Sequence, residues 1–207
     1  MRTRIDYLAD KYSFTELNES PRLRRQWQDV LEECRQTEAG PEERLRIALL
    51  NVDYVTSFEL PFRLLLTRTP QLIAALREEW GISQKNVVFN DKRFGCVYSL
   101  KASLSGVPDT YRYHLSHRIR RVIGSENTSL PYQQVAREMK APRERLKYAL
   151  EAGLLVTALD GLFWFGSQRI AADVLRLRQS RMPIVTTNVE VHDNLTGTTR
   201  KVPAYHL

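Results

Sequence analysis

The run TALDGLFWFGSQRIAADVLRLRQSRMP, residues 157–183, holds the local signals that determine the fold of the C-terminal part of the chain. Thr157 is a favoured helix N-cap residue, and Asp160 follows three residues later, where a carboxylate can bind the amides of the first turn. Gly166 permits a tight turn after this helix, and Ser167 can cap the next one. The run therefore predicts two helices joined by a sharp turn.

The second of these helices is predicted over residues 167–180, with one apolar and one polar face. Ile170, Val174 and Leu177 recur at helical spacing and are expected to point inward. The opposite face is expected to carry Gln168, Arg169, Ala172, Arg176 and Gln179. Such a face suits the major groove of DNA, because Arg pairs with guanine, Gln pairs with adenine and Ala permits close approach. The first two of these residues are expected to contact bases and Arg176 a phosphate, the alternative being an ordinary solvated face. Ser167, at the start of the helix, is a further candidate DNA contact.

A hairpin is predicted after this helix. Residues 184–191 alternate as a half-buried strand, residues 193–197 supply a turn, and residues 198–207 return. Arg200 and Lys201 are expected near the tip, where they would contact the DNA backbone or the minor groove. With a further helix predicted before Gly153, residues 143–207 have the element order of a winged helix-turn-helix, with residues 184–207 as the wing.

The same region resembles a family of helix-turn-helix domains common in phage and prophage proteins. The residues that carry the resemblance are Ala158-Leu159-Asp160, Phe165-Gly166, Arg169 to Asp173, Leu177-Arg178, Pro183 to Thr186, Gly197 and Val202 to Leu207. The resemblance implies binding of double-stranded DNA through the helix at 167–180 and an origin in a phage or mobile element. Members of such families serve as repressors, activators, excision factors and replication or packaging accessories. The sequence departs from the pattern at Arg181-Met182, where a helix-ending Gly is usual.

The charge distribution favours the same interpretation. The chain has a formal net charge of +7. Residues 1–110 carry 16 Lys and Arg against 16 Asp and Glu, whereas residues 111–207 carry 15 against 8. Basic charge concentrated in one half of a chain is expected of a protein that binds a polyanion.

The N-terminal part, residues 1–110, is predicted to be a helical domain with one hairpin. Helices are expected over 21–37, over 41–58 as a central helix that is apolar on nearly every side, and from Thr69 to Gly81. Residues 87–89 and 94–98 flank a polar turn and predict the hairpin. Turn-forming residues at 105–109 predict the boundary with the second domain, residues 111–207.

Helices are also expected between this boundary and the winged segment. One is predicted over 111–123, ended by Gly124, and a pair is predicted from Ser129 to Met139 and from Lys140 to Gly153. This pair resembles a second helix-turn-helix unit. Arg143 and Lys147 of this pair, and Arg118 and Arg121 of the helix over 111–123, are additional candidate DNA contacts.

Several classes of protein are not expected. No apolar run approaches the roughly 20 residues of a membrane span, and the first residues lack the apolar core of a signal peptide. Cys34 and Cys96 each stand alone, which predicts two reduced core thiols and a cytoplasmic protein. His114 and His117 share a predicted helical face, but no paired carboxylates or phosphate-binding glycine loop accompanies them. No metal, cofactor or enzymatic activity is predicted.

The sequence as a whole predicts an α+β fold, predominantly α, and it is compatible with three functions. The preferred one is a phage or mobile-element transcriptional regulator that binds duplex DNA, as a homodimer or with a partner on residues 1–110. The alternative is a phage protein that binds host transcription or defence machinery through the winged domain. The apolar run Leu162-Phe163-Trp164-Phe165 is the candidate docking patch, although core burial would explain it equally well. Catalysis on nucleic acid is the least favoured.

Overall fold

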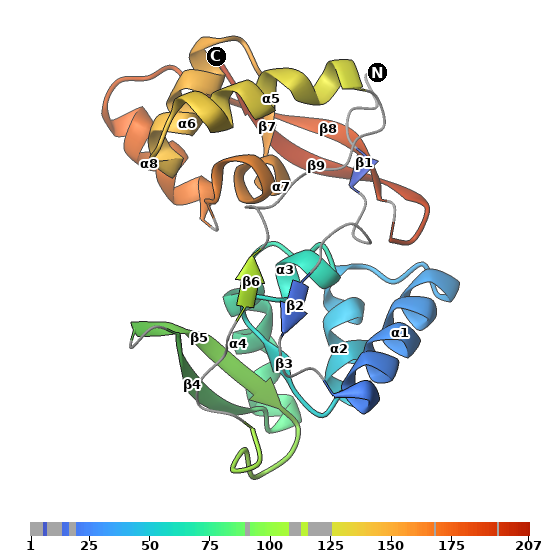
Figure 1. Ribbon diagram of the computed structural model, residues 1–207. Coiled ribbons are helices and arrows are strands. Elements are labelled where there is room, and N and C mark those ends of the chain that lie inside the picture. Colours follow the sequence, from blue (N-terminus) through green and yellow to red (C-terminus); the bar gives the residue numbers. More distant parts are fainter. Residues whose placement is uncertain are drawn as a thin grey trace. The chain divides into compact units, whose positions relative to one another are not determined.

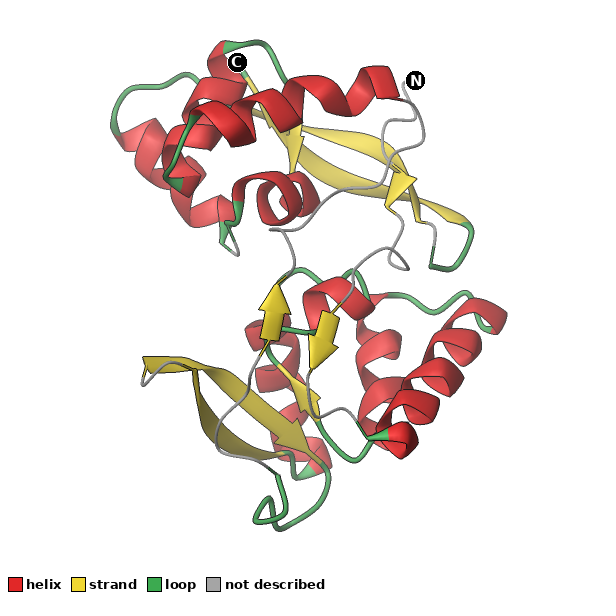
Figure 2. Cartoon of the chain, in the orientation of Figure 1, coloured by secondary structure: helices red, strands yellow, loops and turns green. Residues whose placement is uncertain are grey.

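The computed structural model describes residues 6–7, 14–16, 20–89, 92–107, 113–115, 126–167, 169–193 and 195–207 of the chain. The fold is α+β, as predicted, with helices interleaved with small and mostly antiparallel sheets (Figures 1 and 2). No helix among these residues is both long and apolar enough to cross a membrane.

The chain divides into two compact units. The N-terminal unit comprises residues 12–116, and the C-terminal unit comprises residues 117–207 together with residues 1–11. The sequence instead suggested a boundary at 105–109. The first residues belong to the C-terminal unit because β1 (Asp6–Tyr7) pairs in parallel with β8 (Val185–Asp193).

The N-terminal unit consists of helices followed by a hairpin. Its elements are β2 (Phe14–Glu16), α1 (Pro21–Gln36), α2 (Pro41–Asn51), β3 (Val55–Thr56), α3 (Leu60–Arg63), α4 (Thr69–Trp80), β4 (Ser83–Phe89), β5 (Lys92–Ser99) and β6 (Tyr113–Leu115). The hairpin strands and β3 form one antiparallel sheet in the order β3-β5-β4, and β2 pairs with β6. The predicted hairpin is confirmed and is longer than expected.

Two predicted helices are confirmed by their caps. α1 begins where the Ser20 hydroxyl accepts a hydrogen bond from the Leu23 amide at 3.1 Å. It buries its apolar face, including Cys34. α4 ends at Gly81, which adopts the left-handed conformation with φ of 60° that glycine tolerates.

The predicted helix over 41–58 is wrong in its second half. α2 ends at Asn51, and the apolar residues that follow form a turn and the short strand β3. The helix is also not buried on every side, as a central helix would be, because Leu50 is 65% exposed, and its buried side includes the charged Arg44.

The C-terminal unit has a helical layer and a sheet. Its elements are α5 (Glu126–Glu138), α6 (Pro142–Glu151), β7 (Val156–Thr157), α7 (Ala158–Asp160), η2 (Gly161–Phe165), α8 (Ile170–Gln179), β8 and β9 (Thr198–His206). The strand order is β1-β8-β9-β7, with β9 antiparallel to both β7 and β8. Tyr132 of α5, Leu146 of α6, Phe165 of η2, Val174 of α8 and Tyr205 of β9 all contribute to one apolar core.

Two further predictions in this region need correction. Tyr113–Leu115 is a strand paired with β2 and not part of a helix, while the rest of the predicted helix over 111–123 lies outside the described residues. α5 begins at Glu126, and Pro131, expected at its start, lies inside it. α6 matches its prediction, with Gly153 at φ of 74° just after its end.

Candidate nucleic-acid interface

The turn before α8 is formed by the residues from which the sequence predicted it, Thr157, Asp160 and Gly166. The Thr157 hydroxyl accepts a hydrogen bond from the Asp160 amide at 3.2 Å, and the Asp160 carboxylate accepts one from the Thr157 amide at 2.9 Å. This reciprocal cap starts α7, which continues into η2, a turn of π-helix. Gly166 then takes a left-handed φ of 73°, so the chain reverses towards α8. The predicted sharp turn is therefore confirmed.

α8 presents the two faces that its sequence predicted. Ile170, Val174 and Leu177 are at most 7% exposed and contribute to the core. The outward face carries Arg169, Ala172, Arg176 and Gln179, all of them exposed. Gln168, predicted on the same face, lies outside the described residues.

The start of α8 differs from the prediction. The helix begins at Ile170, with Arg169 in the capping position, so Ser167 does not cap it. Ser167 is only 6% exposed, and its hydroxyl donates a hydrogen bond to the Asp173 carboxylate at 2.7 Å. It is therefore a framework residue in this structure and offers little surface for a DNA contact. The local sequence could not show whether Ser167 caps α8 or binds Asp173, because a Ser hydroxyl is suited to both.

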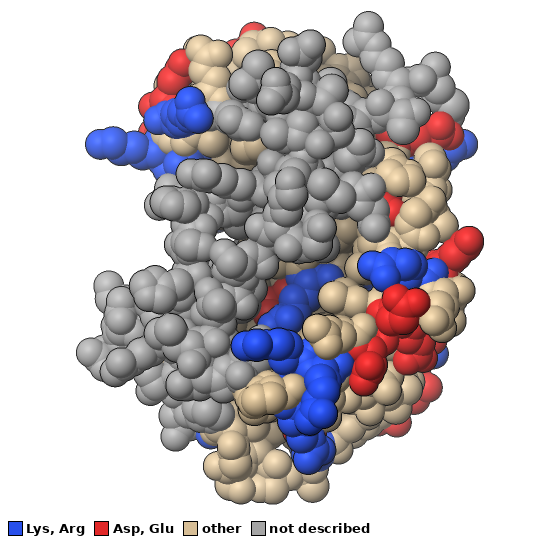
Figure 3. Space-filling view, turned by 45° about the vertical axis from the view of Figure 1, so that its right-hand side comes forward, with Lys and Arg blue, Asp and Glu red and all other residues tan. Residues whose placement is uncertain are grey.

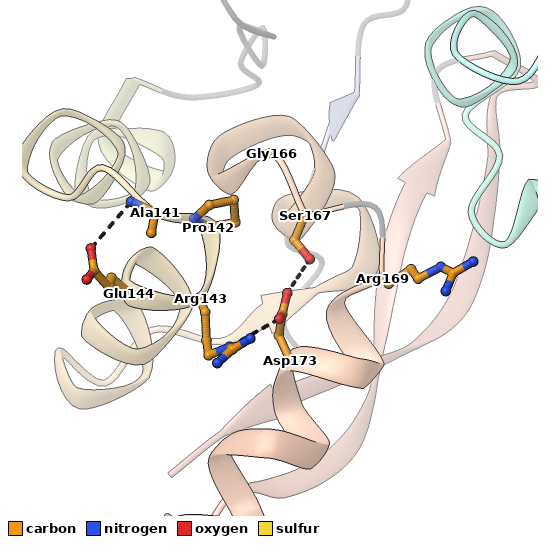
Figure 4. Close-up of a pocket in the computed structure, with 8 residues that line it drawn as sticks. All are labelled: Ala141, Pro142, Arg143, Glu144, Gly166, Ser167, Arg169 and Asp173. Carbon is orange, nitrogen blue, oxygen red and sulfur yellow. Dashed lines mark hydrogen bonds and ion pairs between the residues drawn. The ribbon is translucent and has the colours of Figure 1, made fainter. Parts of the chain in front are cut away.

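A hollow of about 690 Å³ lies between the starts of α6 and α8. Its lining residues are Ala141, Pro142, Arg143, Glu144, Gly166, Ser167, Arg169 and Asp173 (Figure 4). Figure 4 shows the Asp173 carboxylate between Ser167 and Arg143, whose Nε lies 3.5 Å away, while the Arg169 side chain points away from these groups. Asp173, an acidic residue of α8 itself, is thus paired with Arg143.

The additional candidate DNA contacts differ in their surroundings. Arg143 is 47% exposed despite its pairing with Asp173, so it keeps surface towards solvent. Lys147 is 56% exposed and lies 3.7 Å from Glu151 on the same helix. Arg118 and Arg121 lie outside the described residues.

The hairpin separates the two predicted wing cations. Lys201 is exposed on β9, opposite Glu190. Arg200 instead forms an ion pair with the fully buried Asp193, at 2.6 Å between Nη2 and Oδ2, and its side chain is only 21% exposed. Arg200 therefore holds the base of the β8-β9 turn, and Lys201 is the wing cation available to a ligand.

Two residues that sequence analysis did not assign to the framework connect α8 to the hairpin. The Arg178 guanidinium donates to the Ile184 carbonyl at 3.0 Å and to the Thr186 hydroxyl at 2.8 Å. Arg181 has a left-handed φ of 65°, so it occupies the conformation of the helix-ending Gly that is absent here. The sequence pattern that predicted α8 and the hairpin does not indicate that Arg178 binds the hairpin or that Arg181 ends the helix.

The apolar run at 162–165 is part of the core. Leu162, Phe163, Trp164 and Phe165 are at most 6% exposed. The candidate docking patch is therefore not a surface of this unit.

Cationic side chains also gather in the N-terminal unit. On the face drawn in Figure 3, Lys and Arg form a run over this unit beside a group of acidic residues. Arg22 and Lys101 both form ion pairs with Asp53, at 3.2 and 2.6 Å. Within the described ranges, no group of three or more His, Cys, Asp or Glu side chains is arranged to hold a metal ion.

Comparisons of the chain with protein-family models, with curated proteins and with solved structures find no match. The interpretation of this surface therefore depends on its geometry and charge.

Proposed function

We propose that the chain binds double-stranded DNA by placing α8 of the C-terminal unit in the major groove. The observation that carries this proposal is the outward face of α8, where Arg169, Ala172, Arg176 and Gln179 are exposed above a fully apolar inner face. An α-helix with its side chains is about 10–12 Å across and the major groove is about 12 Å wide, so α8 fits the groove.

The order of elements supports a winged helix-turn-helix arrangement. α6 is followed by β7, the α7-η2 helix, a glycine turn, α8 and the β8-β9 hairpin. β7 pairs with β9, so the hairpin is fixed to the helical layer beside α8. In this arrangement the second helix of the pair enters the groove and the hairpin rests on the flanking backbone, where Lys201 would contact phosphate.

The individual side chains suggest distinct roles. Arg169, at the start of α8, is suited to a bidentate contact with guanine, since N-terminal residues of such helices approach the bases. Ala172 permits close approach and can contact a thymine methyl group. Arg176, about two turns after Arg169, is suited to contact a phosphate. The resemblance to phage domains extends this proposal to a transcriptional regulator of a phage or mobile element, acting in the host cytoplasm.

The test is selection of bound duplexes from a random DNA library by the full chain at about physiological salt. We expect an enriched motif. Arg169→Ala should weaken binding by about 1–3 kcal/mol and relax the preference at one base position. Arg176→Ala should weaken binding to all duplexes alike and reduce the salt slope by about 1. Arg137→Ala, which removes an exposed arginine of α5, is the matched control. Unchanged affinity in both α8 variants would refute the assignment of α8.

One observation favours protein docking as the second candidate function. Leu175, also on α8, is 57% exposed, and a helix that docks in the groove of a protein partner does so through apolar side chains on its outer face. Leu175→Gln separates the two functions, because it should abolish docking and leave phosphate contacts intact. Loss of a protein partner with unchanged duplex binding would favour docking.

A further inference from the structure

The two units share a sequence pattern at a separation of 101 residues. Between residues 41 and 77, twelve residues are identical to the residue 101 positions later. They are Pro41, Glu43, Arg44, Leu45, Ala48, Leu49, Val55, Thr56, Phe62, Arg68, Leu76 and Arg77, which match Pro142, Glu144, Arg145, Leu146, Ala149, Leu150, Val156, Thr157, Phe163, Arg169, Leu177 and Arg178. Such self-similarity at a fixed separation indicates a repeated structural unit.

The buried arginines of this pattern make equivalent hydrogen bonds. Arg44 Nε donates to the Ala39 carbonyl at 2.8 Å, and its Nη1 donates to the Leu64 carbonyl at 3.1 Å. Arg145 Nε donates to the Met139 carbonyl at 2.7 Å, and its Nη1 donates to the Phe165 carbonyl at 3.2 Å. Leu64 and Phe165 are themselves 101 residues apart. In each unit the arginine therefore joins the loop before one helix to the end of the next.

The short strands and the threonine hydrogen bonds that follow them are also equivalent. In the N-terminal unit, the Glu59 amide donates to the Thr56 hydroxyl at 3.2 Å, the distance found for Asp160 and Thr157. Val55 pairs with Tyr98 in an antiparallel sheet, as Val156 pairs with Tyr205.

The turn and the helix that follows are matched as well. Leu65 has a left-handed φ of 52° at the position of Gly166. α4 then buries Ile73 and Leu76, which correspond to Val174 and Leu177 of α8. Both units therefore contain helix, short strand, short helix, left-handed turn, longer helix and hairpin in the same order, and both short strands pair with the last hairpin strand.

We infer that the chain is an internal duplication, and that the N-terminal unit is a second duplex-DNA-binding head with α4 as its reading helix. The second part of this inference rests on the function proposed for α8. Arg68 stands at the start of α4 as Arg169 stands at the start of α8, and both are exposed. Gln71 is exposed in the first turn of α4, where an amide side chain can pair with adenine.

The two reading faces differ in chemistry. Gln71 replaces Ala172, Ala75 replaces Arg176 and Glu78 replaces Gln179 at the equivalent positions. The acidic substitution falls in the last turn of α4, whereas the first turn keeps the arginine and gains the glutamine. Because N-terminal residues of such helices approach the bases, α4 retains a base-reading end, with fewer phosphate contacts than α8. A single chain would therefore bind a composite site whose two halves differ in sequence, without needing to dimerise.

The test is selection from a random duplex library with four forms of the full chain. These are the unaltered chain, the α4 variant Arg68→Ala with Gln71→Ala, the α8 variant Arg169→Ala with Arg176→Ala, and a control. The control, Arg35→Ala with Gln36→Ala, removes the same two residue types from the exposed surface of α1. Urea unfolding of each variant verifies that the fold is retained.

The inference predicts a two-part motif for the unaltered chain and the control, bound by one chain per duplex. The α4 variant should lose one half of the motif and the α8 variant the other, each with a loss of affinity of about tenfold or more. If the α4 variant keeps the full motif and affinity while the α8 variant loses them, the second head is refuted and the proposed function stands. If the unaltered chain enriches no duplex, both are refuted.

Discussion

The buried arginines give the sharpest stability prediction. Arg44 is fully buried and Arg145 is 6% exposed, and each donates two hydrogen bonds to backbone carbonyls. A hydrogen bond from a charged donor contributes about 1.5–3 kcal/mol, so two such bonds correspond to roughly 3–6 kcal/mol. Replacement by Ala also leaves a cavity and two buried carbonyls without these donors. Arg44→Ala and Arg145→Ala should each remove a large fraction of the stability of a small domain.

The assay is urea unfolding followed by tryptophan fluorescence. Trp27 and Trp80 belong to the N-terminal unit and Trp164 to the C-terminal unit, so a Trp27→Phe, Trp80→Phe background reports the C-terminal unit alone. With a slope of roughly 2 kcal/mol per M, Arg145→Ala should lower the midpoint seen by Trp164 by about 1.5–3 M.

The matched arginine, Arg44, is tested in the N-terminal unit. In a Trp164→Phe background, the same loss should follow from Arg44→Ala. Arg35→Ala is the control, since Arg35 is 57% exposed and its pairing with Glu32 is worth at most about 1 kcal/mol. A loss below about 1 kcal/mol for either buried arginine would refute the reasoning, because the hydrogen bonds would then not restrain the loops.

Three further substitutions have defined outcomes. Gly161→Ala places a Cβ 2.6 Å from the Ile170 side chain, so it should cost about 1–3 kcal/mol in urea unfolding and displace the start of α8. Arg181→Gly relieves a left-handed φ of 65° and should raise the unfolding free energy by about 1 kcal/mol; a fall would contradict the strain. The hydrogen bond from Lys101 lowers the pKa of Asp53 below 3.8, so the ionised carboxylate stabilises the fold above that pH and this contribution is lost as pH falls through the lowered pKa. The urea midpoint of Asp53→Asn should therefore fall less than that of the unaltered chain between pH 5 and pH 2, and an equal fall would exclude this contribution.

Helices whose ends are marked by capping residues, proline or glycine were predictable from the sequence. α4 lies between Thr69-Pro70 and Gly81, and the helix after Thr157 lies between a capping box and Gly166. Each of these residues acts through its own backbone or the next turn, so a few neighbouring residues contain the whole signal. The orientation of α8 was predictable for a related reason, since its period depends only on residues within the helix.

Elements that depend on distant partners were not predictable. The apolar residues after Asn51 continue the pattern of α2, but they form β3 because β5, more than 40 residues away, supplies its hydrogen bonds. Tyr113–Leu115 similarly becomes a strand by pairing with β2, almost 100 residues earlier. Helix and strand propensities of short apolar runs overlap, so such pairing decides between them.

The exposure of the candidate DNA contacts was predictable for some of them and not for others. Exposure of Arg169 and Arg176 follows from helical period, whereas Ser167 and Arg200 are held by Asp173 and Asp193. An acidic partner across a turn has no fixed spacing that would identify it in a sequence. The repeat was also missed, because its identities are scattered over 37 residues and separated by 101 positions.

The positions of the residues that are identical in the two units indicate how two DNA-binding heads would differ in the sequences they recognise. The matched residues include the buried arginines, apolar core residues of α2 and α6, and the threonines that accept a hydrogen bond from the amide three residues later, which together fix the framework. The outward faces of α4 and α8 have instead diverged at three of the positions that would face DNA, and only the arginine at the helix start is retained. Equal heads would require a symmetric site, which a homodimer of single units could bind as well. Unequal heads on one chain allow recognition of an asymmetric site in one orientation. The orientation of binding, rather than affinity alone, is therefore the property that a duplicated and diverged module would add.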